Sequence, residues 1–280
     1  MDTKKVWLVT GASKGLGLIL VKKLLNHGYR VAATSRSLNA LENAVGKHHN
    51  FLPLQVDLVD EESVEDGISK VLEAFDGIDV VVNNAGYGQN GTLEELSDDE
   101  SRHNFDVNVF GMLNIIRTVM PHLREQKSGH IFNISSIAGM VANFPGFGIY
   151  CATKFAVVGL TEALSSEAKP FGINATVVYP GYFRTEFLSD DSFNLAKNRM
   201  DVYTQARESE RIHKEEIAGN QLGNPEKAAE ALIEVAESVN PTLHLFLGSD
   251  AYNMAQDKLK SLETALENNK ALSHSTDFKN

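Results

Sequence analysis

The sequence predicts an α/β fold in which helices cover both faces of a doubly wound parallel sheet. Two observations lead to this prediction. Short β-branched runs alternate with longer amphipathic segments through the first two-thirds of the 280 residues, which is the pattern of repeated βαβ units. Several of these runs are apolar almost throughout, as expected of strands that are covered on both faces.

The elements follow in order along the chain. We expect strands at 6–10, 30–34, 51–56, 80–83, 130–134 and 174–179, and helices at 15–27, 38–47, 61–75, 97–126 and 149–169. Right-handed crossovers bring the carboxyl ends of such strands to one edge of the sheet. Ligand-binding residues are therefore expected in the turns that follow the strands.

The pattern changes after Pro180. Residues 186–222 are polar, mixed in charge and weakly helical, with no strand signal. We expect 182–222 to cover the site as a lid, since such loops carry specificity. A helix at 225–239 begins with Pro225, a residue suited to the first helical turn. A strand at 244–247 and a helix at 250–268, within a carboxy-terminal segment 250–280, complete a single domain of residues 1–280.

Composition narrows the classes of protein. Hydrophobic residues make up 42% and charged residues 22% of the chain, and the net charge is −11. This charge argues against nucleic acid or an anionic membrane as the main partner. No apolar run approaches the ~20 residues that span a bilayer, and the first residues lack a signal-peptide pattern. The single cysteine, Cys151, excludes an internal disulfide and a cysteine metal cluster. We expect a cytoplasmic protein without a metal site.

A glycine-rich turn lies between the first strand and the first helix. It reads Thr10-Gly11-Ala12-Ser13-Lys14-Gly15-Leu16-Gly17. Glycine permits a tight turn, close approach of a phosphate, and close packing of the helix on the strand. The helix start then offers free N–H groups to a pyrophosphate. Such a turn at the first βα junction predicts a dinucleotide site and makes the sheet one of the Rossmann type.

The end of the second strand indicates which dinucleotide binds. It reads Thr34-Ser35-Arg36, without the acidic residue that usually holds the ribose 2′-hydroxyl of NAD. Arg36, together with Lys14 in the glycine turn, could accommodate a 2′-phosphate instead. Each could also be a solvated surface charge. The two cations together favour NADP(H) over NAD(H).

Tyr150 and Lys154 form a candidate proton donor. Residues four apart on a helix share a face, so both heads can enter one cleft. A neighbouring ammonium favours the phenolate and lowers the pKa of a phenol toward the range useful for general acid–base catalysis. This spacing is common by chance, so its meaning depends on the motifs around it.

Those motifs resemble the short-chain dehydrogenase/reductase family, in its single-domain branch. They are the glycine turn Thr10–Gly17, Asp57, Asn83-Asn84-Ala85-Gly86, Asn108, Ser136, Tyr150-Cys-Ala-Thr-Lys154 and Pro180-Gly181. They occur in the family's order and cover roughly residues 5–185, with the core continuing to about 247. The set is far more specific than any one member.

The resemblance implies a role for each catalytic position. Tyr150 would be the general acid and base, and Ser136 would hydrogen-bond the substrate oxygen. Lys154 would lower the phenol pKa and hold the nicotinamide ribose. Asn108 would bend its helix and hold a water linked to the lysine.

The remaining matches would bind the cofactor. Asp57 would contact the adenine, or cap a turn. Pro180, Gly181 and Thr185 would lie alongside the nicotinamide, with the Phe183 backbone near its carboxamide. The full cofactor set comprises Gly11, Ser13, Lys14, Gly15, Leu16, Gly17, Arg36, Asp57, Leu58, Asn84, Ala85, Gly86, Tyr150, Lys154, Pro180, Gly181, Phe183 and Thr185.

The resemblance implies hydride transfer between NADP(H) and a carbonyl or secondary alcohol. Two alternatives stay open: a catalytically silent dinucleotide sensor on the same fold, and a dehydratase or epimerase that uses transient hydride transfer. Asn143, Phe144, Phe147 and Tyr182 are candidates for a partly apolar substrate pocket. The substrate is a small molecule whose identity the sequence leaves open. The family suggests a homodimer or a homotetramer.

Overall fold

Seven parallel strands form the central sheet of the computed structural model, which describes residues 4–189 and 192–278. Their order is β3-β2-β1-β4-β6-β7-β9, so the direction of winding reverses between β1 and β4. The doubly wound parallel sheet of the sequence prediction is confirmed. The strands are β1 (Val6–Val9), β2 (Arg30–Ser35), β3 (Phe51–Gln55), β4 (Val80–Asn83), β6 (Gly129–Ile134), β7 (Ile173–Pro180) and β9 (His244–Leu247).

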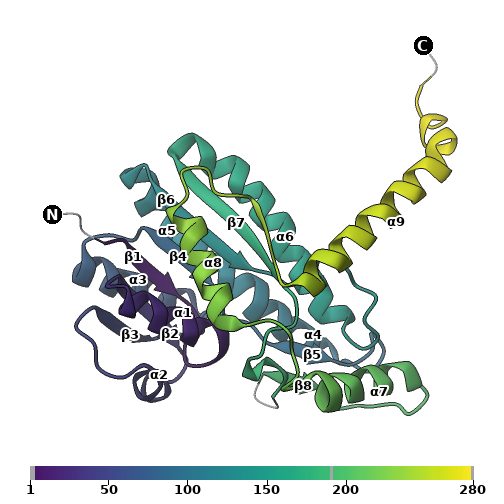
Figure 1. Ribbon diagram of the computed structural model, residues 1–280, viewed down its shortest axis with the longest axis horizontal. Coiled ribbons are helices and arrows are strands. Elements are labelled where there is room, and N and C mark those ends of the chain that lie inside the picture. Colours follow the sequence, from purple (N-terminus) through teal and green to yellow (C-terminus); the bar gives the residue numbers. More distant parts are fainter. Residues whose placement is uncertain (1–3, 190–191, 279–280) are drawn as a thin grey trace.

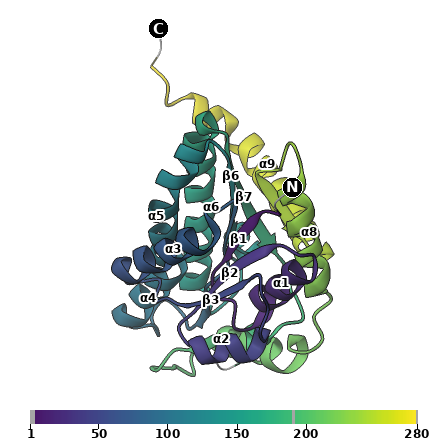
Figure 2. The same ribbon diagram turned by 90° about the vertical axis from the view of Figure 1, so that its left-hand side faces the viewer.

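Helices cover both faces of this sheet (Figure 2). One face carries α3 (Glu61–Phe75), α4 (Asp98–Phe105), α5 (Gly111–Gln126) and α6 (Gly148–Ala168). The other carries α1 (Gly15–Asn26), α2 (Leu38–Val45) and α8 (Pro225–Glu237). Each face has its own apolar core, one built around Val64, Ile115 and Val157 and the other around Leu20, Leu41 and Leu232. Burying a side chain of this size stabilises the fold by roughly 1.5–3 kcal/mol, so the two cores fix the sheet between the layers.

The helix expected at 97–126 is interrupted in its middle. It begins at α4, where Ser97 and Glu100 form a reciprocal capping box. A π-helical turn, Asp106–Phe110, then separates α4 from α5. Such turns widen a helix locally and often occur at functional sites. Asn108 lies in the centre of this turn.

A second, two-stranded parallel sheet pairs β5 (Gly88–Asn90) with β8 (Phe193–Leu195). The absence of a strand signal in 186–222 therefore led to a wrong prediction for β8. Three residues are too few to show an alternating pattern, and the pairing partner lies far away in the sequence. The segment continues as α7 (Thr204–Arg211) and a π-helical turn, Ile212–Ile217. Residues 190 and 191 of the expected lid lie outside the described residues.

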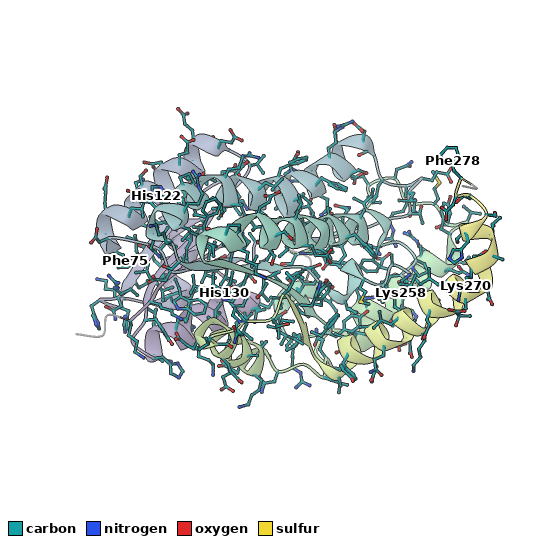
Figure 3. All side chains as sticks on the ribbon, turned by 90° about the horizontal axis from the view of Figure 1, so that it is seen from above. Phe75, His122, His130, Lys258, Lys270 and Phe278 are labelled. Atoms are coloured by element: carbon teal, nitrogen blue, oxygen red, sulfur yellow. The ribbon has the colours of Figure 1, made fainter. Side chains whose placement is uncertain are left out.

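The last helix, α9 (Ser249–His274), is longer than expected and projects away from the sheet and its helices (Figure 1). Figure 3 shows Lys258 and Lys270 along this helix, at the opposite end of the molecule from Phe75 and His122. Only Ala251 and Ala255 of α9 are buried. Among the described helices, none has the length and apolarity that crossing a membrane requires.

Glu95 links the segment that contains β8 and α7 to the rest of the fold through buried hydrogen bonds. Its residue exposure is 1%, and its carboxylate accepts hydrogen bonds from the backbone N–H groups of Thr92 (2.8 Å) and Met200 (2.7 Å). The Arg207 guanidinium donates to both carboxylate oxygens at 2.8 Å. Burial alone would raise the pKa of Glu95, but these backbone donors and the charge of Arg207 outweigh it and hold the pKa below its ordinary value.

The variant Glu95→Ala tests this anchor. It leaves Arg207 and two backbone N–H groups without their buried partner, so the free energy of unfolding should fall by about 3 kcal/mol. Urea denaturation at pH 7 measures the change. The control is Glu94→Ala, which removes an exposed carboxylate that contacts Tyr203 and should cost less than about 1 kcal/mol. Equal losses in the two variants would contradict the anchor.

Candidate active site

A cleft of about 450 Å³ opens where the strands of the main sheet end. Almost all of the predicted site residues line it, which confirms that the sheet brings them together. Those that line it are Gly11, Ser13, Lys14, Gly15, Leu16, Arg36, Asp57, Leu58, Asn84, Ala85, Gly86, Ser136, Tyr150, Lys154, Pro180, Gly181, Phe183 and Thr185. Gly17 and Asn108 lie behind the wall instead.

The glycine turn is pressed against the end of β4. Gly11 has a φ of 65°, and a Cβ placed on it would lie 2.7 Å from Ala85 Cα. The Asn84 amide donates to the carbonyl oxygens of Thr10 (2.9 Å) and Gly11 (3.0 Å). A Cβ on Gly17 would lie 2.5 Å from that amide nitrogen. Gly17 is therefore needed for packing behind the cleft rather than for direct contact within it.

The start of α1 lines the cleft, and its first backbone N–H groups have no acceptor within the helix. Lys14 occupies the N-cap position, and its side chain forms no capping hydrogen bond. The first N–H groups of a helix that lacks a capping side chain can bind an anion, assisted by the helix dipole. Gly11, Gly15 and the N-terminal turn of α1 thus form a cradle that fits the pyrophosphate of a dinucleotide.

Two cations line the part of the cleft beside β2. Arg36 is exposed directly after β2, and Lys14 is partly buried in the glycine turn. Asp57 lies nearby after β3, where its carboxylate accepts a hydrogen bond from the backbone N–H of Val59 at 3.1 Å. Asp57 therefore caps its turn while it also lines the cleft, so the two roles weighed for it are compatible.

Tyr150, Lys154 and Ser136 meet in the centre of the cleft. Tyr150 and Lys154 come from α6, while Ser136 follows β6 and precedes the 3₁₀ turn Ile137–Gly139. The Lys154 ammonium lies 5.8 Å from the centroid of the Tyr150 ring and donates to the Ile134 carbonyl oxygen at 2.9 Å. All three side chains line the cleft.

The protonation of this cluster differs from the sequence expectation. Burial raises the pKa of Tyr150 well above its ordinary value, and a hydrogen bond with Ser136 only partly opposes this effect. Burial also lowers the pKa of Lys154 to about 8. The expected lowering of the phenol pKa by Lys154 is therefore not found in the protein alone. The physical reason is that desolvation disfavours both charged forms, while the ammonium is directed at a carbonyl oxygen.

The two neighbouring serines have different surroundings. The Ser135 hydroxyl is buried and donates to the Lys154 backbone carbonyl at 2.8 Å. The Ser136 hydroxyl accepts from Ala138 N at 3.1 Å and interacts with Tyr150. Ser135 thus holds α6 against β6, whereas Ser136 presents its hydroxyl beside the phenol, in keeping with the choice of Ser136 as the catalytic candidate.

Asn108 organises the layer behind the cluster. Its side-chain oxygen accepts from Tyr87 N at 3.0 Å, and its amide donates to Tyr87 O at 3.0 Å and to Thr153 Oγ1 at 3.2 Å. A Cβ on Gly86 would lie 3.0 Å from Asn108 Oδ1 and 3.6 Å from Lys154 Nζ. Asn108 and Lys154 therefore both approach Gly86, where any side chain would crowd them.

The cleft contains both substrate-pocket residues that the sequence predicted and residues that it did not. Phe144, Phe147 and Tyr182 line it as expected, but Asn143 does not. The unforeseen lining residues include His213 and Gln221. Neither has a sequence signal, because both lie in a polar, charged stretch where such residues usually face solvent.

Asp250, at the start of α9, was also missed. Its carboxylate accepts from Tyr182 N at 2.6 Å, and a Cβ on Gly181 would lie 2.2 Å from its nearest oxygen. The carboxylate therefore fixes the turn that follows β7 and explains why glycine is required at position 181. This gives Gly181 a packing reason beyond any contact with a cofactor.

Known proteins are similar to this chain in sequence and architecture. A model of the family described as short chain dehydrogenase matches residues 5–196. A 3-ketodihydrosphingosine reductase from Bacteroides thetaiotaomicron is 35% identical over 246 residues, 87% of this chain and 88% of that protein. The crystal structure of a short-chain dehydrogenase from Streptomyces avermitilis has a TM-score of 0.89 and 33% identity, covering 98% of this chain and 100% of the other.

A further solved structure was determined with a cofactor. It is ElxO with NADP bound, which has a TM-score of 0.73 and 28% identity, covering 89% of this chain and 99% of the other. The matched family model spans well over half of the residues, including the glycine turn and the Tyr150 cluster. The chain therefore belongs to the short-chain dehydrogenase family of oxidoreductases.

Proposed function

We propose that this protein is an NADP(H)-dependent carbonyl reductase or alcohol dehydrogenase. The observation that carries the proposal is the meeting of Ser136, Tyr150 and Lys154 in one cleft with the cradle at the start of α1. The cradle fits a dinucleotide because the start of α1 lacks a capping side chain and can bind a pyrophosphate. The bound nicotinamide would supply the hydride, and this chain would supply the proton and the stabilising contacts.

The residues would divide the chemistry as follows. Negative charge develops on the substrate oxygen as its carbon is reduced, and a donor placed at that oxygen stabilises the transition state most. Tyr150 would donate its proton there, which its raised pKa permits because the phenol stays protonated at neutral pH. Ser136 would give that oxygen a second hydrogen bond, and Lys154 would hold the ribose hydroxyls. Asn108 would support Lys154 and help carry protons to solvent.

A curated relative supports the reductive direction. The Bacteroides protein is named for the reduction of a ketone, 3-ketodihydrosphingosine, so a ketone is the substrate class that we propose for this chain. Segment 182–222 would act as the lid over that ketone, because Phe187, Leu188 and His213 from it line the cleft.

A silent dinucleotide sensor is the less favoured function. Such a protein has no need for an acid, a hydroxyl and a buried ammonium together. The ammonium of Lys154 is retained although its residue exposure is only 5%, and burying a charge in this way lowers stability. A chemical use for Lys154 accounts for its retention. An epimerase or dehydratase gains no specific support from the site.

The variant Tyr150→Phe tests the mechanism. Removing the hydroxyl eliminates the proton donor, so kcat for ketone reduction should fall by roughly 10³-fold or more. NADPH affinity, measured by fluorescence titration, should change by less than about threefold, because the ring still packs against Phe147 and Phe187. Near-normal turnover in this variant would refute the assignment of Tyr150.

The variant Arg36→Asp tests the cofactor preference. An acidic residue here should repel a 2′-phosphate and accept hydrogen bonds from a ribose hydroxyl. The ratio of kcat/KM for NADPH to that for NADH should therefore fall by about 100-fold or more. The control is Lys22→Asp, which changes the net charge equally at an exposed position of α1 outside the cleft. An unchanged ratio in Arg36→Asp would reject the 2′-phosphate assignment.

The variant Lys154→Met tests the cost of the buried ammonium. The pKa of Lys154 is lowered from 10.5 to about 8, so the folded protein binds fewer protons than the unfolded chain between these pH values. The destabilisation caused by burying the charged ammonium is therefore full below about pH 8 and is relieved as the pH rises toward 10.5.

Lys154→Met should consequently raise the free energy of unfolding at pH 7 by about 1–2 kcal/mol and abolish turnover. The gain should shrink as the pH approaches 10. Urea denaturation across this pH range measures it, with the exposed Lys22→Met as the control. A variant that is less stable than the wild type at pH 7 would contradict this account.

A further inference from the structure

Three polar side chains of segment 182–222 line the cleft, and we call them together the polar end. Tyr182 lies on the turn after β7, His213 on the π-helical turn after α7, and Gln221 shortly before α8. All three line the cleft. Family membership assigns no task to this group, and the mechanism proposed above does not use it.

The hydrogen bonds of the polar end have a defined direction. His213 Nδ1 lies 2.6 Å from the Ser209 carbonyl oxygen, which can only accept, so the proton resides on Nδ1. His213 Nε2 must then accept from the Tyr182 hydroxyl, 2.9 Å away. The only proton of that hydroxyl is thereby used. The phenolic oxygen of Tyr182 is left with lone pairs and no free hydrogen.

Both groups are held neutral by burial. Burial lowers the pKa of His213, and the backbone hydrogen bond to Ser209 only partly opposes this. Burial, reinforced by the charge of Asp250, raises the pKa of Tyr182 to about 12. At neutral pH the polar end therefore presents acceptor oxygens rather than a cation, so it does not suit a carboxylate or a phosphate.

Gln221 adds an acceptor whose hydrogen-bonding capacity is not met. Its exposure is 4%, and its side-chain carbonyl oxygen has no hydrogen-bond partner among the described residues. Its backbone is held in place, because the Gln221 carbonyl oxygen accepts from Arg184 at 3.1 Å. A buried polar atom without a partner costs about 1–3 kcal/mol. A ligand hydroxyl that reached this buried oxygen, as the Gln221 side chain turned toward the cleft, would remove that cost.

Apolar side chains separate the polar end from the reacting centre. The Phe147 ring centroid lies 6.4 Å from that of Tyr150 and 4.7 Å from that of His213. Phe144, Phe187 and Leu188 line the same stretch. A molecule with its carbonyl beside Tyr150 and a benzene ring beside Phe147 would therefore place its far end near His213 and the hydrogen-bonded Tyr182.

We propose that Tyr182, His213 and Gln221 form a specificity subsite that selects ketones carrying a hydroxyl group at the end remote from the carbonyl. The hydroxyl donates to Gln221 Oε1 or to the phenolic oxygen of Tyr182, and His213 fixes the orientation of Tyr182. The inference rests on the proposed carbonyl reductase function and specifies its substrate class. It is an assignment of binding selectivity, separate from the proton transfer at Tyr150.

Matched ketones provide the test. The probes are p-hydroxybenzylacetone and p-methylbenzylacetone, which differ by a hydroxyl in place of a methyl group. Binding is measured by isothermal titration to the Tyr150→Phe variant saturated with NADPH, so that no turnover disturbs the equilibrium. The hydroxyl compound should bind about tenfold more tightly. Equal dissociation constants, or no binding of either ketone, would overturn the subsite.

Variants locate the selectivity. Gln221→Leu in the same background should bring the two dissociation constants to within about twofold of each other. Gln205→Leu, an equivalent change at an exposed position of α7, should preserve the preference. Tyr182→Phe provides a second route if Gln221→Leu does not fold, and it too should reduce the preference. Full retention of the preference in either subsite variant would refute the assignment.

A separate readout distinguishes the two proposals. NADPH oxidation by the wild-type protein with p-methylbenzylacetone tests carbonyl reduction without involving the hydroxyl. Turnover without a binding preference supports the reductase and overturns the subsite. A binding preference without turnover of either ketone supports the subsite and contradicts the reductase.

Discussion

The attachment of α6 to the end of β6 is the constraint on which the site depends. Lys154 is held at two points, because its ammonium donates to the Ile134 carbonyl oxygen and its backbone carbonyl accepts from the Ser135 hydroxyl. A Cβ on Gly139 would lie 2.7 Å from that same backbone oxygen, so the 3₁₀ turn and the helix are in direct contact. This contact sets the height of Tyr150 on α6 relative to Ser136 on the turn.

The same attachment explains why a buried ammonium is tolerated. An isolated charge in an apolar site is very unfavourable, and burial lowers the pKa of Lys154 accordingly. Its hydrogen bond to Ile134 and the polar layer of Asn108 and Thr153 behind it reduce the penalty. The fold thus retains a destabilising group at the cleft, where the proposed proton transfer would use it.

Much of this fold and site could be predicted from the sequence because the signals were local. The strands of the main sheet are apolar runs, and the turn at Gly11 and the pair at Tyr150 lie within short motifs. The strands β5 and β8 escaped because their pairing joins segments about 100 residues apart, Gly88–Asn90 and Phe193–Leu195. The direction of the Tyr150 pKa shift was also wrong, since motif spacing gives no measure of desolvation.

His213 and Gln221 escaped for a different reason. Both are polar residues in a charged stretch, and only the path of the chain over the cleft makes them buried. Asp250 is similar, because its partner Tyr182 is 68 residues away in the sequence. Tertiary contacts of this kind carry no periodic signal that a sequence pattern can reveal.

The anchoring of the β8–α7 segment through Glu95 has an evolutionary consequence. The side chains that fasten it, such as Arg207, contact the region before α4, while others, such as His213 and Gln221, face the cleft. One set secures the segment and the other lines the cleft, so the two can mutate independently. The family match ends at residue 196, within this segment. A lineage could therefore acquire a new substrate by exchanging the cleft-facing residues while keeping the residues that attach the segment to the fold.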